Sequence, residues 1–180
     1  TERFTHDGKA ARAGFVVFGR HVTHKRIDLA IKACNEIAAK LVVIGDGPET
    51  PRLKSIAGPT IEFVGRVSDE RMVDYLARAE AFIFPNEEDF GIVSLEAQAA
   101  GLPVIAYRAG GALDTVIEGV TGEFFDAQDP EVLAETLKNF NYKLYSRQDI
   151  IKNAEKFSNE HFLESMHKTV EKLTKTSKRH

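Results

Sequence analysis

The chain has 180 residues, which corresponds to about one domain and is long enough to bury a core without a disulfide or a structural metal. Hydrophobic residues make up 43% and charged residues 28% of the chain, and this balance excludes wholesale disorder. The formal net charge of -3 excludes a surface that is basic throughout but leaves a local basic patch open, and we expect no nucleic-acid partner.

Short apolar runs alternate with helical patterns along the chain. The runs predict strands buried on both faces at residues 15–18, 41–44, 61–64, 81–84 and 103–106, with a weaker candidate at 122–125. Apolar residues between Ile27 and Ala38 share one helical face, and those between Met72 and Ala79 share another after a cap at Ser68. This alternation predicts an α/β fold: a Rossmann-like parallel sheet of about six strands with helices on both faces.

From Pro130 onward the pattern is purely helical. Three apolar helical faces follow one another: Leu133, Leu137 and Phe140; Ile150, Ala154 and Phe157; and Phe162, Met166 and Val170. We therefore expect a helical C-terminal part that ends in a frayed tail at 175–180.

The cysteine and hydropathy patterns limit the cellular locations that we expect for the chain. Cys34 is the single cysteine and no zinc-type spacing exists, which favours a reducing, cytoplasmic location and no metal. No apolar run approaches the roughly 20 residues that span a bilayer. The sequence leaves attachment to a membrane surface open.

Glycine and charged residues follow the predicted strands. They lie at 19–25, 45–48, 65–68, 85–91 and 108–111, each directly after an apolar run. Open parallel sheets bind ligands beyond the carboxyl ends of their strands. We therefore expect the functional residues along this one edge.

The segment from Glu88 to Glu96 carries the densest chemistry. Gly91 is expected to open a helix that runs to about Ala100, whose first N–H groups and dipole would attract an anion. Glu96 could then accept hydrogen bonds from two vicinal hydroxyls, and Glu88 could meet a second polar part of the same ligand. The alternatives are solvated carboxylates, with Glu88 stabilising the helix start, or a metal held by residues 87–89, which lack an Asp-x-Asp motif.

Two cations flank the first crossover helix. Arg20 and Lys25 could neutralise a diphosphate, although each alone could equally be a surface cation. His21 and His24 have no third metal ligand nearby in the sequence. Residues 45–48 lack the last glycine of a dinucleotide fingerprint, so we interpret them as a helix start with Pro48 near its first turn.

Taken together, these segments resemble the C-terminal donor-binding domain of a GT-B retaining glycosyltransferase of group 1 (family 4). The resemblance is carried by residues 18–25, 43–49, 63–67, 84–92, 95–106 and 110–114, and it runs from about Thr1 to Phe125. It implies one GT-B half-domain of an enzyme that transfers a sugar from a nucleotide diphosphate sugar, such as a GDP- or UDP-sugar, to a glycan or lipid-linked acceptor. It also implies retention at the anomeric carbon.

The resemblance further implies roles for individual residues. Glu88 and Glu96 match the family's E-x7-E pair, the first near the transferred sugar and the second on the ribose hydroxyls. Glu88, Arg20 and Lys25 would be catalytic, with the two cations on the diphosphate. The other implied donor contacts are Gly19, Phe90, Gly91 and Ile92 near the phosphates and sugar, and Arg66 and Val67 beside the base. The family needs no metal and no cofactor, because fixed positive charge stabilises the leaving diphosphate.

The sequence departs from the family pattern in two ways. Asp89 stands where the family often has glycine. An aspartate at this position resembles a WbaZ-like mannosyltransferase subset, which favours GDP-mannose as the donor. The chain is also about half the usual length, so residues 1–13 are interpreted as a residual interdomain linker, 14–174 as the nucleotide-sugar-binding domain and 175–180 as a tail.

The short length also limits the expected activity. A missing N-terminal domain would bind the acceptor and mediate any contact with the inner membrane face, so this chain is expected to bind nucleotide but to transfer sugar poorly. The alternatives are a fragment of a nucleotide-sugar epimerase and a non-catalytic nucleotide-binding module.

Overall fold

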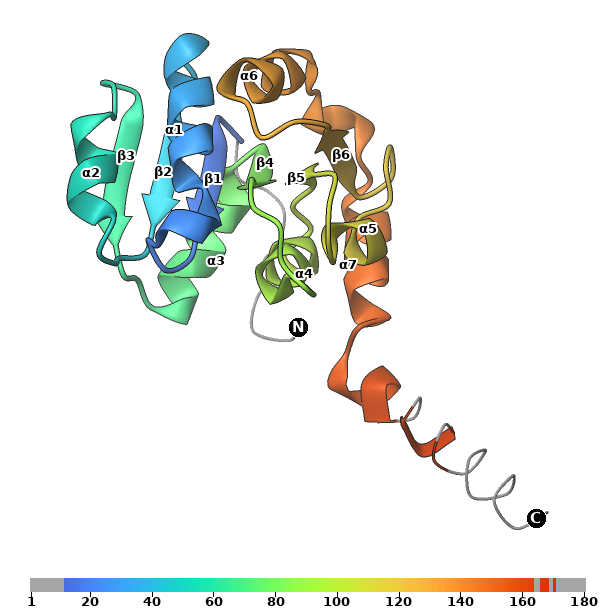
Figure 1. The fold of residues 1–180 in the computed structure, drawn as a ribbon. Coiled ribbons are helices and arrows are strands. Elements are labelled where there is room, and N and C mark those ends of the chain that lie inside the picture. The colour runs from blue at the N-terminus through green and yellow to red at the C-terminus, as the bar shows by residue number, and fades with distance from the viewer. Residues whose placement is uncertain (1–11, 164–165, 169, 171–180) are drawn as a thin grey trace.

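The computed structural model describes residues 12–163, 166–168 and 170, which form an α/β unit (Figure 1). The strands are β1 (Phe15–Phe18), β2 (Leu41–Ile44), β3 (Ile61–Gly65), β4 (Ala81–Phe84), β5 (Val104–Tyr107) and β6 (Gly122–Phe125). The helices are α1 (Ile27–Glu36), α2 (Thr50–Ser55), α3 (Asp69–Arg78), α4 (Ile92–Ala99), α5 (Ala112–Thr115), α6 (Pro130–Asn139) and α7 (Arg147–Glu155). Two 3-10 turns, η2 (Thr23–Lys25) and η3 (Tyr142–Leu144), complete the named elements.

The described strands form one parallel sheet in the order β3-β2-β1-β4-β5-β6. This confirms the predicted fold class. The chain reverses its direction of progress across the sheet between β1 and β4, the position at which open parallel sheets commonly form a ligand-binding crevice. The fifth strand begins at Val104 rather than at residue 103 as predicted, because Pro103 has no N–H to donate to the sheet and contributes only its carbonyl, which accepts from Phe82 N at 2.9 Å.

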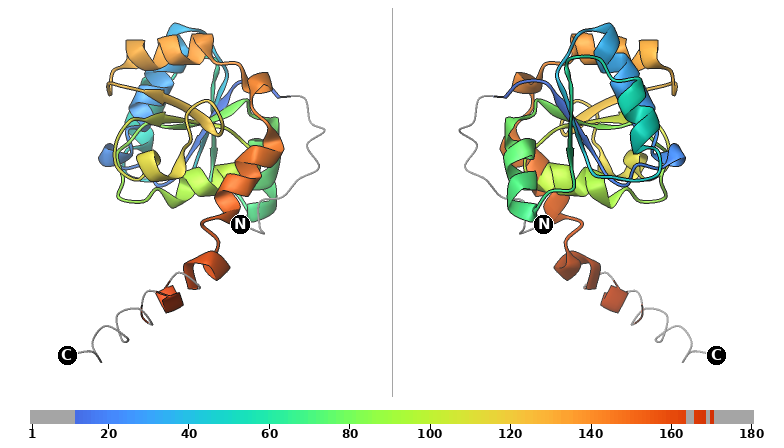
Figure 2. Two further views of the ribbon diagram at one scale, coloured as in Figure 1. Left: turned by 90° about the vertical axis from the view of Figure 1, so that its right-hand side faces the viewer. Right: turned by 90° about the vertical axis from the view of Figure 1, so that its left-hand side faces the viewer.

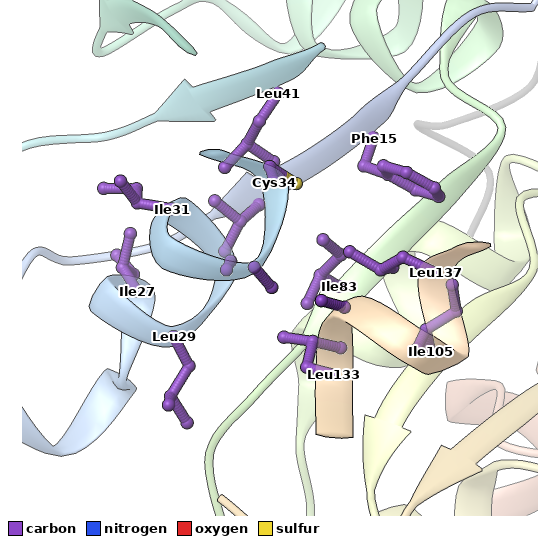
Figure 3. Packing of buried hydrophobic residues seen from close by; sticks show 14 of the residues in the cluster. Phe15, Ile27, Leu29, Ile31, Cys34, Leu41, Ile83, Ile105, Leu133 and Leu137 are labelled. Carbon is purple, nitrogen blue, oxygen red and sulfur yellow. The ribbon is translucent and has the colours of Figure 1, made fainter. Parts of the chain in front are cut away.

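Hydrophobic layers cover both faces of the sheet. On one face, α1 and α6 pack over alternate strand residues such as Phe15, Leu41 and Ile83 (Figure 3). On the other, α3, α4 and α7 pack over the intervening residues, among them Phe82 and Phe84. Figure 2 shows the helices above and below the sheet. The continuous apolar runs are thus explained, since neighbouring residues of a strand enter opposite cores.

The helix starts match the predictions with one exception. The Ser68 hydroxyl caps α3 by accepting from Arg71 N at 3.4 Å, and Gly91 precedes α4, both as predicted. The prediction for Pro48 was wrong. Pro51 occupies the first turn of α2, where a missing N–H costs least, and Pro48 lies in the preceding loop.

The C-terminal part follows its predicted helical pattern only in part. Leu133 and Leu137 of α6 and Ile150 and Ala154 of α7 are buried, as expected of core faces. Phe140 and Phe157 lie just beyond the ends of these helices. The third apolar set does not join the core: Phe162, Met166 and Val170 are 61%, 47% and 51% exposed. Figure 1 shows the described part of this segment extending away from the sheet.

Other predictions for the chain ends lie outside the described residues. These are the linker over most of residues 1–13 and the tail at 175–180. Among the residues that the structure describes, none forms a helix long and apolar enough to cross a bilayer.

Candidate functional site

A cleft of about 390 Å³ opens beyond the carboxyl ends of β1, β2 and β3. Phe18, Ile44, Val67 and Met72 supply apolar walls. The remaining lining residues are polar or lack a side chain: Gly19, Arg20, Gly45, Asp46 and Arg66. Predicted site residues from two separate loops, Gly19 and Arg20 from one and Arg66 and Val67 from the other, therefore line one cleft.

Glycines allow the loops around this cleft to approach closely. Gly45 has φ +120°, and a Cβ there would overlap the carbonyl oxygen of Gly19. Gly19 N donates to Ile44 O at 3.1 Å, and Gly45 N donates to Gly65 O at 2.8 Å. Three consecutive loops are thus joined by backbone contacts, which fixes the rim of the cleft.

Asp46 places a carboxylate at this rim. Hydrogen bonds from the Thr50 hydroxyl at 2.9 Å and from Gly47 N at 2.8 Å lower the pKa of Asp46, and the nearby Arg66 adds to the effect. The carboxylate therefore stays ionised near neutral pH. The cleft offers a ligand both positive and negative groups beside an apolar wall.

Lys25 and Glu88 meet across the crevice between β1 and β4. The Lys25 ammonium donates to Glu88 Oε1, although the two residues are 63 positions apart in the chain. Asn86 Nδ2 donates to the same oxygen at 2.7 Å. Partial burial lowers the pKa of Lys25, but this side chain and that of Glu88 remain 24% and 21% exposed. A ligand entering the crevice could therefore reach both charged groups.

The loop that carries Glu88 is held from two sides. Gly111 N donates to Glu88 O at 2.7 Å, and a Cβ on Gly111 would lie 2.5 Å from Phe90 Cα. On the other side, Gln128 Nε2 donates to Pro85 O at 3.1 Å. Arg26 Nη1 donates in turn to Gln128 Oε1 at 2.7 Å. The ion pair, the close backbone approach at Gly111 and the amide of Gln128 together fix the position of the loop that carries Glu88.

Helix α4 begins beside this loop without a side-chain cap. Gly91 occupies its N-cap position in the left-handed conformation, with φ +77° and ψ +54°. Side chains cap α3, α6 and α7, whereas α4, like α1, α2 and α5, has no side-chain cap. The first N–H groups of α4 and the helix dipole can receive an anionic ligand. Phe90 and Ile92 flank this start and are 45% and 63% exposed.

A buried polar network supports α4 from behind. The Ser94 hydroxyl lies 2.9 Å from Gly91 O and 3.1 Å from Thr115 Oγ1. Gln98 Nε2 donates to Thr115 O at 2.9 Å, and Asn153 Nδ2 of α7 donates to Gln98 Oε1 at 2.8 Å and to Thr115 O at 2.9 Å. These polar side chains are at most 3% exposed. The start of α4 is therefore tied through hydrogen bonds to α5 and α7.

The predicted site residues fall into three neighbouring groups. One lines the cleft, the second is the Lys25–Glu88 pair, and the third comprises Phe90, Gly91, Ile92 and Glu96 at and along α4. Glu96 lies on α4 and is partly buried. All three groups follow carboxyl ends of β1, β3 or β4.

Several residues of this edge were missed from the sequence. Gln128 and Asn153 bind partners that are distant in the chain, so no signal in the sequence pointed to them. Asn86 binds the nearby Glu88, and its position between a buried strand and Glu88 was an available signal. Among the residues that the structure describes, no group of three or more His, Cys, Asp or Glu side chains could hold a metal ion.

The chain folds as a Rossmann-like α/β domain, a class in which ligands generally bind at the loops that follow the strands. The chain belongs to the family of glycosyl transferases group 1, whose family model matches residues 2–157. Among curated relatives, it is 33% identical over 156 residues to the GDP-mannose-dependent alpha-mannosyltransferase of Mycobacterium tuberculosis, a match that covers 83% of this chain and 40% of that relative. The chain thus spans well under half the length of this relative.

Solved structures share the architecture. HepE from Anabaena, solved in complex with UDP, matches with a TM-score of 0.79 at 19% identity over 95% of this chain and 55% of that one. The C-terminal domain of the group 1 family protein LpcC from Francisella tularensis matches with a TM-score of 0.63 at 22% identity over 85% of this chain and 87% of that one. These likenesses establish the fold, that of a GT-B half-domain.

Proposed function

We propose that this chain is the donor-binding domain of a retaining glycosyltransferase and binds a nucleotide diphosphate sugar along the carboxyl edge of its sheet. The observation that carries the proposal is the meeting of Lys25 and Glu88 across the crevice, beside the uncapped start of α4. A cation, a carboxylate and free N–H groups suit a ligand with a diphosphate next to a sugar.

The expected chemistry is stabilisation of a leaving diphosphate. When the bond between the anomeric carbon and the diphosphate breaks, negative charge grows on the phosphate oxygens. Lys25, Arg20 and the start of α4 would offset that charge without a metal, because preorganised positive groups stabilise a transition state more than a ground state. Glu88 would contact the sugar, Glu96 the ribose, and the Arg66 cleft the base.

The donor and the reaction partners belong to the same proposal. A GDP-mannose-dependent relative and the position of Asp89 favour GDP-mannose, whereas the HepE complex contains UDP, so both nucleotides are tested. Retention at the anomeric carbon follows from the family resemblance of residues 88–96. The domain would occupy residues 14–174 and act with an N-terminal acceptor-binding domain, and peripheral attachment at the inner membrane face would belong to that other half. A cytoplasmic location stays a prediction.

Calorimetric titration with UDP, GDP and ADP tests the proposal. We expect saturable binding of at least one nucleotide, and binding about tenfold weaker or worse after Lys25→Ala or Glu96→Ala, since a hydrogen bond to a charged group contributes about 1.5–3 kcal/mol. Lys32→Ala is the matched control, because Lys32 is an exposed lysine of α1 that pairs with Asp28 and is not among the proposed donor contacts.

The outcomes separate the competing functions. Equal affinity in Lys25→Ala and Lys32→Ala would contradict the proposed site. If no nucleotide binds to the folded chain, a module without donor-binding activity is favoured. Turnover by this chain alone at the rate of a full-length relative would contradict the need for a second domain, and epimerised sugar as the product would favour the epimerase.

A further inference from the structure

His21 is a buried residue that the proposed donor contacts do not use. It follows Arg20 in the loop between β1 and α1 and has no exposed surface. Its backbone is held by the loop after β2: His21 N donates to Asp46 O at 3.0 Å, and Glu49 N donates to His21 O at 3.0 Å. Gly47 makes room for this contact, since a Cβ there would overlap His21 O.

The side chain of His21 adds a third link to the same loop. Its Nδ1 lies 2.8 Å from Thr50 Oγ1, at the start of α2. Thr50 Oγ1 in turn lies 2.9 Å from Asp46 Oδ1 and accepts from Gly47 N at 3.0 Å. An ionised carboxylate can only accept, so the Thr50 hydroxyl gives its proton to Asp46. The threonine oxygen must then accept from His21, which assigns the proton of the ring to Nδ1.

The surroundings keep this imidazole neutral. Burial lowers the pKa of His21. The backbone carbonyl of Ile44 and the carboxylate of Asp46 oppose this effect, while Lys54 of α2 adds to it. From β3 the neighbour is the uncharged ring of Phe63, at 6.2 Å between ring centroids. Nε2 is buried and has no hydrogen-bond partner among the described residues.

We propose that His21 is a positioning residue for the donor diphosphate, which holds Gly19 and Arg20 in place through its hydrogen bond to Thr50 and Asp46. The inference rests on the proposed function. On the other side of Arg20, Gly19 N donates to Ile44 O at 3.1 Å, and Val22 N donates to the Arg20 carbonyl at 2.9 Å. His21 adds the side-chain hydrogen bond that ties the Arg20 backbone to the start of α2.

Two pairs of variants test the inference. His21→Asn keeps an N–H near the position of Nδ1 and His21→Leu removes it; Thr50→Ser keeps the hydroxyl and Thr50→Val removes it. Each folded variant is titrated with UDP or GDP, whichever the unaltered chain binds more tightly, and with the corresponding nucleoside. We expect the Leu and Val variants to bind the diphosphate about tenfold more weakly and the nucleoside unchanged, the Asn and Ser variants to retain most of the affinity, and nitrogen NMR to find the His21 proton on Nδ1.

The opposite results overturn the inference. Unchanged diphosphate affinity in His21→Leu would refute a positioning role, and an equal loss for diphosphate and nucleoside would show a general collapse of the cleft. A proton on Nε2 would refute the hydrogen-bond assignment. If the unaltered chain binds no nucleotide, the proposed function fails and this inference with it, whereas binding that survives in His21→Leu removes the inference alone.

Discussion

Replacing Gly91 by alanine should destabilise the fold through two separable effects. The left-handed backbone at φ +77° costs an alanine about 1–2 kcal/mol. The new Cβ would also lie 2.8 Å from Cζ and 3.0 Å from Cε1 of Phe84, a ring that is 1% exposed. Overpacking of this kind costs about 1–3 kcal/mol. We expect a total loss of about 2–5 kcal/mol in the free energy of unfolding, measured by urea denaturation.

Gly119 provides the matched control. Its φ is +72°, close to that of Gly91, but nothing lies within 4 Å of where its Cβ would be. Gly119→Ala should therefore lose only the backbone contribution of about 1–2 kcal/mol. Phe84→Leu combined with Gly91→Ala should recover stability beyond additivity, because the shorter side chain removes the ring atoms in question. Equal losses for the two glycine variants would refute the steric reasoning.

Other consequences concern buried polar and titratable groups. Asn153→Leu should cost about 1–3 kcal/mol in urea denaturation because it leaves the Gln98 carbonyl without a donor, and a loss no larger than that of the exposed Lys152→Ala would contradict this. The Cys34 thiol is fully buried with its pKa raised to about 12, so we expect it to react with an aromatic disulfide only as fast as the protein opens; rapid labelling of the native protein would show otherwise. Because the folded pKa of His21 lies below its ordinary 6.5, the unfolded chain takes up this proton first, and stability should fall with pH below about 6.5. In thermal melts at a series of pH values, the melting temperature of His21→Asn should fall less steeply below pH 6.5 than that of the unaltered chain. An equally steep fall would contradict a lowered pKa of His21 in the folded state.

The fold could be predicted from the sequence because its strands are short, apolar and evenly separated by helical patterns. Both faces of the sheet are covered, so no polar alternation obscured the strands. The errors were local. Pro51, not Pro48, lies in the first turn of α2, because the glycine-containing loop continues further than the pattern indicated. The apolar set of Phe162, Met166 and Val170 was expected to resemble the core faces before it, but periodicity does not say whether a partner surface is present.

The candidate site was predictable in its loops but not in its supports. Parallel strands bring their carboxyl ends to one edge, which is why Lys25 and Glu88 could be expected to lie near each other. The roles assigned to individual site residues remain predictions. Gln98 and Asn153 could not be paired from the sequence, because a polar residue on an apolar helix face has many distant candidates as partners, and only the packing of α4 on α7 selects one.

The attachment of α7 also sets a limit on truncation. If the chain were shortened before residue 147, Gln98 and the Thr115 carbonyl would lose the amide of Asn153, and Phe90 would lose the ring of Phe157, whose centroid lies 6.0 Å away. The loop that carries Glu88 and Phe90, together with α4, would then lose its contacts with α7 and Phe157 even though every strand remained. A minimal version of this domain must therefore extend at least to Phe157, well beyond the last strand of its sheet.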